Sequence, residues 1–315
     1  MTSSKANRTA NPDLPNWRGV FPAVTTQFHQ DNSVDIAGTN AVIGGLIRDG
    51  VHGLVLMGTV GENNSLSAQE KRAILTAAVK AVDKRVPIIT GVSELTTSTA
   101  AQFAKDAEEL GVDGLMVLPA MVYSPTEAEL ETHFKTVAKA TSVPIMLYNN
   151  PASYKISIPI DMVVRLSNIA NIVCIKEAAE DTRRITDLIN ALDDSMIVFA
   201  GLDDMAFEAL ALGAKGWVSG LTNAFPKESV AIYELMQQGD YASALEIYRW
   251  FMPLLHLDSQ PDLVQSIKLA EQIMGRGSER VRMPRMILRG ARRKEVIAIV
   301  EDARNALPSL SAKSA

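Results

Sequence analysis

The sequence holds a single cysteine, Cys174, among its 315 residues. One cysteine excludes an intrachain disulfide and fits a reducing compartment. No stretch reaches the roughly 18 consecutive apolar residues that a membrane-spanning helix needs. The first sixteen residues, MTSSKANRTANPDLPN, lack the apolar core of a signal peptide. Together these absences predict a cytoplasmic protein.

An excess of one charge is also missing. The chain has 36 acidic and 31 basic residues, a formal net charge of −5, and no long block of either sign. Such a balance gives no electrostatic basis for binding nucleic acid or an anionic membrane. The only histidines, at positions 29, 52, 133 and 256, include no pair with metal-ligand spacing, and there is no phosphate-binding glycine motif. We therefore expect neither a metal nor a nucleotide cofactor.

Apolar residues, by contrast, are plentiful. They make up 47% of the chain, charged residues make up 21%, and the mean hydropathy is +0.07. Such a composition allows a large buried core and is typical of a globular protein. The length alone is compatible with one large α/β domain or with two small ones.

Eight short apolar, β-rich runs recur along the chain, and each is followed by a segment of helical period. They begin near residues 20, 53, 86, 114, 143, 171, 196 and 216. Ser67 with Glu70 three residues later predicts a capping box that opens one of the helices. Alternating strands and helices imply parallel pairing. Eight such units fit a (β/α)₈ TIM barrel better than an open doubly wound sheet.

After the eighth run the pattern is helical only. We expect the barrel over residues 17–225, and the last barrel helix with a C-terminal helical extension over 226–307. Residues 1–16 and 308–315 are predicted to be flexible tails.

The sixth run, NIVCIKE, contains a lysine where a buried strand is expected. In a barrel of this kind the chemistry lies at the carboxyl ends of the strands. Apolar neighbours there would lower the pKa of Lys176 and make its amine a nucleophile toward a carbonyl, as a Schiff base requires. The alternative is a structural ion pair with Glu177 or another carboxylate.

Two further features lie at neighbouring strand ends. Tyr148 closes the fifth run, where its phenol can relay protons to the adduct or simply pack in the core or rim. The turn GTVGE, residues 58–62, offers backbone N–H groups to a carboxylate, although glycines at strand ends often serve only tight turns.

Four motifs in order, GTVGE, YNNP, CIKEA and GAKGWVSGLTNAFP, resemble the dihydrodipicolinate synthase and N-acetylneuraminate lyase family. The resemblance covers roughly residues 17 to 305. It implies a cofactor-free class I enzyme that binds a 2-oxo acid, or its imine, covalently on lysine. It also implies a homotetramer, a dimer of dimers.

The resemblance assigns roles to residues of this chain. Lys176 matches the Schiff-base lysine, Tyr148 the proton-relay tyrosine, and Thr59 the hydroxyl residue that bonds the tyrosine and the substrate carboxylate. The implied substrate-binding positions are Gly58, Val60, Gly61, Glu62, Ser153, Gly201 and Ser219.

This chain also departs from the dihydrodipicolinate synthases. Val60 replaces the second hydroxyl residue of the turn. Ala120 and Met121 stand where those synthases have a tyrosine pair, and Tyr123 is displaced, so their tyrosine relay is expected to be absent. Ser153 stands at the position of the arginine that binds the second substrate's carboxylate, and Lys155 lacks the bidentate geometry of arginine.

Within the family, YNNP followed by Tyr154-Lys155-Ile156, together with RRIT, GLDD and RWFMPLLHLD, resembles the branch that degrades hydroxyproline. The implied reaction is deamination of 1-pyrroline-4-hydroxy-2-carboxylate to 2,5-dioxopentanoate and ammonia. Alternatives are a 2-keto-3-deoxy sugar acid dehydratase or aldolase, 4-hydroxy-tetrahydrodipicolinate synthesis, or a barrel kept as a non-catalytic scaffold. The apolar AMV and GWVSGL segments favour the smaller ring substrate over a polyhydroxylated one.

Overall fold

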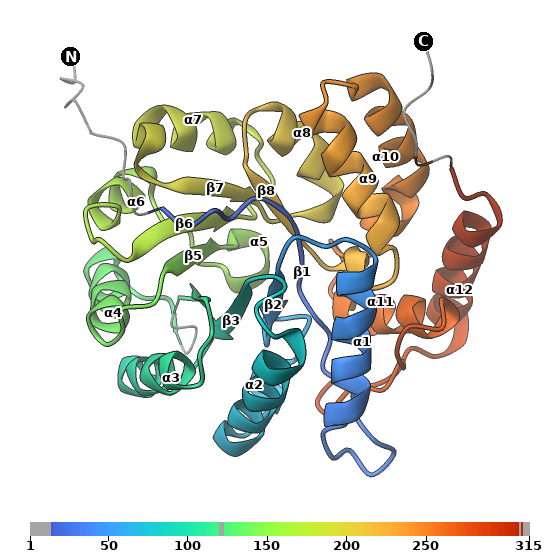
Figure 1. Ribbon diagram of the computed structural model, residues 1–315, viewed down its shortest axis with the longest axis horizontal. Helices are drawn as coiled ribbons and strands as arrows, with labels where there is room; N and C mark the ends of the chain where they lie inside the picture. The colour runs from blue at the N-terminus through green and yellow to red at the C-terminus, as the bar shows by residue number, and fades with distance from the viewer. Residues whose placement is uncertain (1–13, 120–122, 309, 311–315) are drawn as a thin grey trace.

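The computed structural model describes residues 14–119, 123–308 and 310 of the chain (Figure 1). Its centre is a set of eight parallel strands, and each begins within about three residues of a run expected from the sequence. The strands are β1 (Gly19–Pro22), β2 (Leu54–Leu56), β3 (Ile88–Val92), β4 (Gly114–Val117), β5 (Ile145–Asn149), β6 (Ile172–Glu177), β7 (Ile197–Ala200) and β8 (Gly216–Ser219).

The strands form a ring. Their order in the sheet is β1-β8-β7-β6-β5-β4-β3-β2, with every neighbouring pair parallel. The gap between β1 and β2 is closed just beyond β1, by a parallel bridge between Ala23 and Val55 and a 2.9 Å hydrogen bond from Val24 N to Val55 O. The predicted (β/α)₈ TIM barrel is confirmed.

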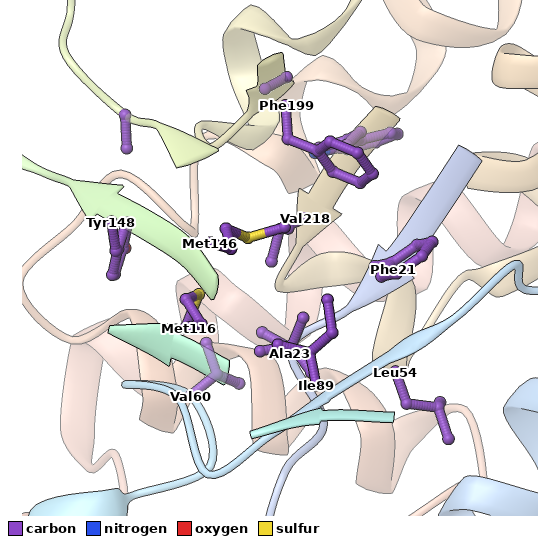
Figure 2. Packing of buried hydrophobic residues seen from close by; sticks show 14 of the residues in the cluster. Phe21, Ala23, Leu54, Val60, Ile89, Met116, Met146, Tyr148, Phe199 and Val218 are labelled. Atoms are coloured by element: carbon purple, nitrogen blue, oxygen red, sulfur yellow. The ribbon is translucent and has the colours of Figure 1, made fainter. Parts of the chain in front are cut away.

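The interior of the barrel is a packed core. All strand residues are buried, as expected when helices cover a parallel sheet. Figure 2 shows Phe21, Met116, Met146 and Phe199 among the side chains gathered between the strands. The Phe21 and Phe199 rings meet edge to face with centroids 5.2 Å apart. A Cβ on Gly216 would lie 2.4 Å from the Phe199 ring, so this glycine makes room for it. A ligand must therefore bind at an end of the barrel.

Helices follow the strands and surround them (Figure 1). The expected capping box is present, because Ser67 and Glu70 bond reciprocally at the start of the second helix. No helix in the described part of the chain is both long and apolar enough to span a bilayer. The barrel helices are α1 (Ile36–Arg48), α2 (Ala68–Val82), α3 (Thr97–Glu109), α4 (Glu127–Lys139), α5 (Pro151–Tyr154), α6 (Ile160–Leu166), α7 (Arg183–Leu192), α8 (Ala206–Ala211) and α9 (Pro226–Gln237).

Three more helices form the extension: α10 (Tyr241–Leu255), α11 (Leu263–Ile273) and α12 (Gly290–Asn305). They lie together on one side of the barrel (Figure 1). Helix α11 joins the barrel through buried polar contacts. Lys268 Nζ lies 2.9 Å from Glu62 Oε1 and donates to the Thr26 carbonyl at 2.7 Å. Because both charges of this pair are fully buried and hydrogen-bonded, α11 is held in one position against the turn after β2.

Candidate active site

A cavity of about 570 Å³ opens at the carboxyl ends of the strands. Its wall comes from the ends of β2, β5, β6, β7 and β8, from α5, and from the loop between α10 and α11. The side chains with the most evident chemistry are Thr59, Tyr148, Tyr154, Lys176 and Asp258. The structure therefore brings together the three residues expected to be catalytic.

The pairing of β5 with β6 places Lys176 beside Tyr148. Ile145 pairs with Ile172, but Met146 pairs with Cys174, so one residue of β6 is passed over. After this irregularity Tyr148 pairs with Lys176. A shift of one residue reverses the face to which each side chain points. The irregularity thus decides that lysine and tyrosine share the cavity.

Lys176 is 6% exposed, and its Nζ lies 4.1 Å from the centroid of the Tyr148 ring. Burial lowers the pKa of the Lys176 amine, while the Asp258 carboxyl, Tyr154 and Asp203 oppose that shift. Desolvation is the largest of these effects, so the uncharged amine is favoured relative to a lysine in water. An uncharged amine at an open cavity is a nucleophile for a carbonyl or imine carbon.

The alternative of an ion pair between Lys176 and Glu177 is not what the structure shows. The Glu177 carboxylate binds Arg184 at 3.0 Å, accepts from Asn149 Nδ2 at 2.7 Å, and accepts from the Ala179 amide at 2.8 Å. These partners lie on the other side of β6, as expected for consecutive strand residues. Lys176 is left free to face the cavity.

Tyr148 is buried at the end of β5. Its hydroxyl accepts a 2.9 Å hydrogen bond from Asn150 Nδ2. Burial raises the pKa of the Tyr148 phenol above its usual value, and the bond from Asn150 opposes that shift. The phenol therefore stays protonated at neutral pH and can donate its proton and recover it. Its ring meets that of Tyr154 edge to face, with centroids 5.7 Å apart.

Thr59 differs from the expectation in one contact. Its hydroxyl forms a short hydrogen bond with the hydroxyl of Tyr154, whereas the resemblance implied a bond to Tyr148. Tyr154 ends the short helix α5, which begins at the proline of the YNNP segment and lines the cavity. From the sequence, Tyr154 was noted only as one residue of the motif Tyr154-Lys155-Ile156 and was given no role of its own. The two phenols and the Thr59 hydroxyl form one connected group at the cavity wall.

The turn after β2 presents backbone donors. Met57 and Glu62 adopt left-handed φ angles of 51° and 55°, and Asn63 Nδ2 ties the turn to Met57 O at 2.8 Å and Gly91 O at 3.1 Å. Within the described residues, the amides of Thr59 and Val60 have no hydrogen-bond acceptor. Neighbouring free amides beside a hydroxyl can bind a carboxylate.

The other predicted positions divide into two groups. Gly58, Val60, Ser153 and Gly201 line the cavity. Gly61, Glu62 and Ser219 lie behind its wall. A Cβ on Gly61 would lie 2.9 Å from Met57 and Val24 backbone atoms, the Glu62 carboxylate faces Lys268, and Ser219 Oγ accepts from the Thr222 amide at 3.1 Å.

Positions Ala120 and Met121, where a tyrosine pair was expected to be absent, lie outside the described residues. Tyr123 is 54% exposed and lies apart from this cavity. Lys155 does line the cavity, with its Nζ donating to the Ala152 carbonyl at 2.8 Å.

Three charged residues near Lys176 were missed by sequence reasoning. Asp203 follows β7 and accepts from Trp217 Nε1 at 2.9 Å and from the Leu221 amide at 2.8 Å. Burial raises its pKa to about 6, against these hydrogen bonds. Asp258 and Arg285 reach the cavity from the extension. The segments GLDD and RWFMPLLHLD contained both aspartates, but no local pattern placed them near the lysine.

Within residues 14–119, 123–308 and 310, no group of three His, Cys, Asp or Glu side chains is arranged to hold a metal ion. The functional groups that line the cavity include the Lys176 amine, two phenols, the Thr59 hydroxyl and the Asp258 carboxyl.

Comparison with known proteins gives three consistent results. Residues 16–303 match the sequence model of the dihydrodipicolinate synthetase family. The chain is 32% identical over 272 residues to a 4-hydroxy-tetrahydrodipicolinate synthase of Methanosarcina mazei, covering 85% of this chain and 92% of that protein. It is 35% identical over 240 residues to the synthase of Syntrophobacter fumaroxidans, covering 76% and 82%.

Solved structures agree with these matches. The 4-hydroxy-tetrahydrodipicolinate synthase of Methylacidiphilum fumariolicum SolV superposes with a TM-score of 0.88 at 28% identity, covering 92% of this chain and 97% of that one. A dihydrodipicolinic acid synthase family protein of E. coli K12, solved in complex with pyruvate, gives a TM-score of 0.87 at 29% identity, covering 92% and 99%.

Proposed function

The chain belongs to the dihydrodipicolinate synthetase family, and we propose that it is a class I lyase that binds a 2-oxo acid or a cyclic imine as a Schiff base on Lys176. The observation that carries this proposal is the buried Lys176 amine, which faces Tyr148 in an open cavity. Its lowered pKa favours the nucleophilic form. The covalent adduct itself serves as the electron sink, so no cofactor is needed.

Each neighbour has a role in this proposal. The free amides of Thr59 and Val60, with the Thr59 hydroxyl, bind the substrate carboxylate and so hold C2 in front of Lys176. Tyr148 moves protons between the nitrogen and oxygen of the adduct. Tyr154 holds Thr59 in place through the hydroxyl–hydroxyl bond.

For the substrate we propose 1-pyrroline-4-hydroxy-2-carboxylate. Lys176 attacks C2, opens the ring and leaves a primary amine on C5. Water is then eliminated across C3 and C4, the double bond moves to make C5 an imine, and hydrolysis at C5 and C2 releases ammonia and 2,5-dioxopentanoate. Two waters are consumed and one is released. Support comes from Tyr154-Lys155-Ile156 after YNNP and from Ser153 at the arginine position of the synthases.

A second candidate is 4-hydroxy-tetrahydrodipicolinate synthesis, the activity in the names of the relatives described above. Arg285 favours it. Its side chain lines the cavity and makes no hydrogen bond or ion pair with the described residues. A guanidinium there can bind the carboxylate of a second substrate. This candidate therefore differs from the first in needing Arg285.

The deciding experiment measures ammonia released by the purified protein from 1-pyrroline-4-hydroxy-2-carboxylate, coupled to a dehydrogenase that consumes 2,5-dioxopentanoate. Lys176→Ala is assayed alongside, and both proteins are incubated with pyruvate and borohydride. We expect release, and a trapped adduct on the peptide containing Lys176, in the wild type alone. Trapping without ammonia release would reject this substrate and send the search to aspartate semialdehyde with pyruvate, and then to sugar acids. Absence of any adduct would reject the lyase itself and favour a scaffold.

The homotetramer stays a prediction from the resemblance, and the cytoplasmic location stays a prediction from the sequence. Sedimentation of the purified protein tests the first of these.

A further inference from the structure

Asp258 is a cavity-lining carboxyl with no role in the steps above. It lies in the loop between α10 and α11, so it reaches the barrel mouth from the extension. Its charge interacts with that of Lys176. The backbone of Asp203 donates to the Asp258 carboxyl, and no other hydrogen bond or ion pair joins that carboxyl to the described residues. Part of the hydrogen-bonding capacity of the Asp258 carboxyl is therefore available to a ligand.

The loop that carries Asp258 is fixed on both sides of it. The Asp204 carboxylate accepts from Ser259 Oγ at 2.6 Å and bonds to His256 Nδ1 at 3.0 Å. Asp258 also packs against the end of β8, where a Cβ on Gly220 would lie 2.4 Å from Oδ1. Glycine at position 220 is thus what allows the carboxyl to lie so close to the strand. Such fixation from two elements is what a positioned acid or base requires.

The surroundings of Asp258 favour its protonated form. Burial and the nearby Asp203 carboxyl raise the pKa of Asp258 well above its usual value, Asp204 adds to this, and Lys176 opposes it. Glu180 and Arg285 also border the cavity. A carboxyl with a raised pKa holds its proton to higher pH than usual and can donate it to a leaving group.

The reaction proposed above contains one step that needs such a donor. Hydroxide is a poor leaving group, so loss of the C4 hydroxyl is slow unless the oxygen is protonated as its bond to carbon breaks. Lys176 is occupied by the imine at C2. Arg285 is a poor donor, because a guanidinium stays charged in proteins.

We propose that Asp258 is the general acid that protonates the C4 hydroxyl of the ring-opened adduct, an inference that rests on the function proposed above. A proton passes from C3 to solvent water and leaves an enamine, whose electron pair forms the C3–C4 double bond as the C4–O bond breaks. The proton of Asp258 goes to that oxygen, and water leaves. The resulting carboxylate then takes a proton from C5, which restores the acid and begins conversion of the C5 amine to the imine.

The test compares Asp258→Asn with Asp187→Asn, which removes one exposed carboxylate on α7. We expect D187N to match the wild type in ammonia release and D258N to have a kcat lowered at least 100-fold. Trapping of Lys176 by pyruvate and borohydride should be unchanged in D258N, because pyruvate carries no leaving hydroxyl. Borohydride quenching of D258N with the pyrroline substrate should give an adduct that still carries the C4 oxygen.

A second variant guards against a folding defect. Asp258→Ala leaves space for a small acid, so added formate should restore part of its ammonia release. An unchanged kcat in D258N would overturn the inference, and so would loss of pyruvate trapping together with activity, which would show a purely structural role. If the wild type itself releases no ammonia, the proposed function fails and this inference fails with it. If the wild type releases ammonia and D258N keeps its kcat, only the inference about Asp258 fails and the proposed function stands.

Discussion

Two opposing effects act on the amine of Lys176. Removing an ammonium from water costs free energy, and the nearby carboxyls and phenol recover only part of it. A buried lysine with a full ion pair, such as Lys268 with Glu62, keeps its partner within 2.9 Å. Lys176 has no ion pair of this kind among the described residues, and its Nζ lies over the face of the Tyr148 ring. The contrast within one protein separates a lysine with a buried ion pair from a lysine that faces an open cavity without one.

Replacing Tyr148 with phenylalanine tests the proton relay. The ring that packs against Lys176 is kept, and only the hydroxyl bonded to Asn150 is lost. We expect kcat to fall about 10²- to 10⁴-fold, the usual contribution of a positioned acid or base, with the melting temperature nearly unchanged. Tyr241→Phe, at a phenol that is 51% exposed, is the control. A Y148F enzyme with wild-type kcat would assign the relay elsewhere, first to Tyr154.

Sequence reasoning identified Lys176 and Tyr148 because both end an apolar run, and a polar group there needs an explanation. Tyr154 and Asp258 gave no such signal. Tyr154 follows a proline-containing turn whose direction depends on α5, and Asp258 is one of many acidic residues in a helical region. Their approach to Lys176 is a property of three-dimensional packing, which a single sequence does not encode locally.

At the scale of elements, the contact between β6 and β7 leaves no room beside Lys176. A Cβ at Gly201 would lie 2.8 Å from the Glu177 carbonyl oxygen and 2.9 Å from Lys176 Cγ. Backbone atoms cannot yield as a flexible side chain can. Gly201 therefore keeps the end of β7 close to β6 without displacing the lysine.

Gly201→Ala should consequently lower both the rate of adduct formation at Lys176 and the stability of the fold. We expect a tenfold or greater loss in the rate of pyruvate trapping at Lys176, with a loss of about 1–3 kcal/mol in unfolding free energy from the forced shift. Gly44→Ala is the matched control. It lies in α1, where the new Cβ meets only the end of the flexible Arg48 side chain at 3.4 Å, and alanine favours a helix. A G201A protein that is trapped as fast as the wild type would contradict the steric argument.

The strands were predicted at nearly the right positions because hydrophobic periodicity is local. Their register was not predicted. The irregularity between Ile145 and Met146 arises from how two strands pair, and neither strand alone indicates it. The bond from Asn63 of the β2 turn to Gly91 likewise depends on the neighbouring strand β3.

At the scale of the whole molecule, the extension is docked on the barrel by buried polar groups. Glu271 of α11 accepts a 2.9 Å hydrogen bond from Thr25, and its second oxygen is buried without a partner in the described residues. Burial raises the pKa of Glu271 to about 7, while Thr25, Lys268 and Arg276 oppose this. The carboxyl thus titrates near neutral pH in the folded protein.

Because the pKa of Glu271 is raised, this residue makes the folded protein more stable at low pH than at high pH. In the unfolded chain Glu271 loses its proton near pH 4.5, so between that pH and about 7 the folded state binds the proton more tightly. Protonation of Glu271 therefore contributes about 3 kcal/mol to the free energy of unfolding below pH 4.5. This contribution is lost as the pH rises through about 7. Glu271→Gln removes this dependence. We expect the unfolding free energy of E271Q relative to the wild type to rise between pH 5 and pH 8.

Urea titrations at several pH values measure this difference. Glu301→Gln, at an exposed site on α12, is the control and should show the same pH dependence as the wild type. Parallel curves for E271Q and the wild type would mean that Glu271 has an ordinary pKa in the folded protein.

The pairing of β1 with β8 has a consequence for how the protein is made. Gly19 pairs with Gly216, so the first strand to leave the ribosome finds its main partner only after almost the entire barrel has been synthesised. Long-range pairing of this kind closes slowly. The residues that line the cavity run from Ala23 to Arg285, so its last members are synthesised after the ring. A nascent chain therefore carries Lys176 for much of translation before the cavity that this lysine faces is complete.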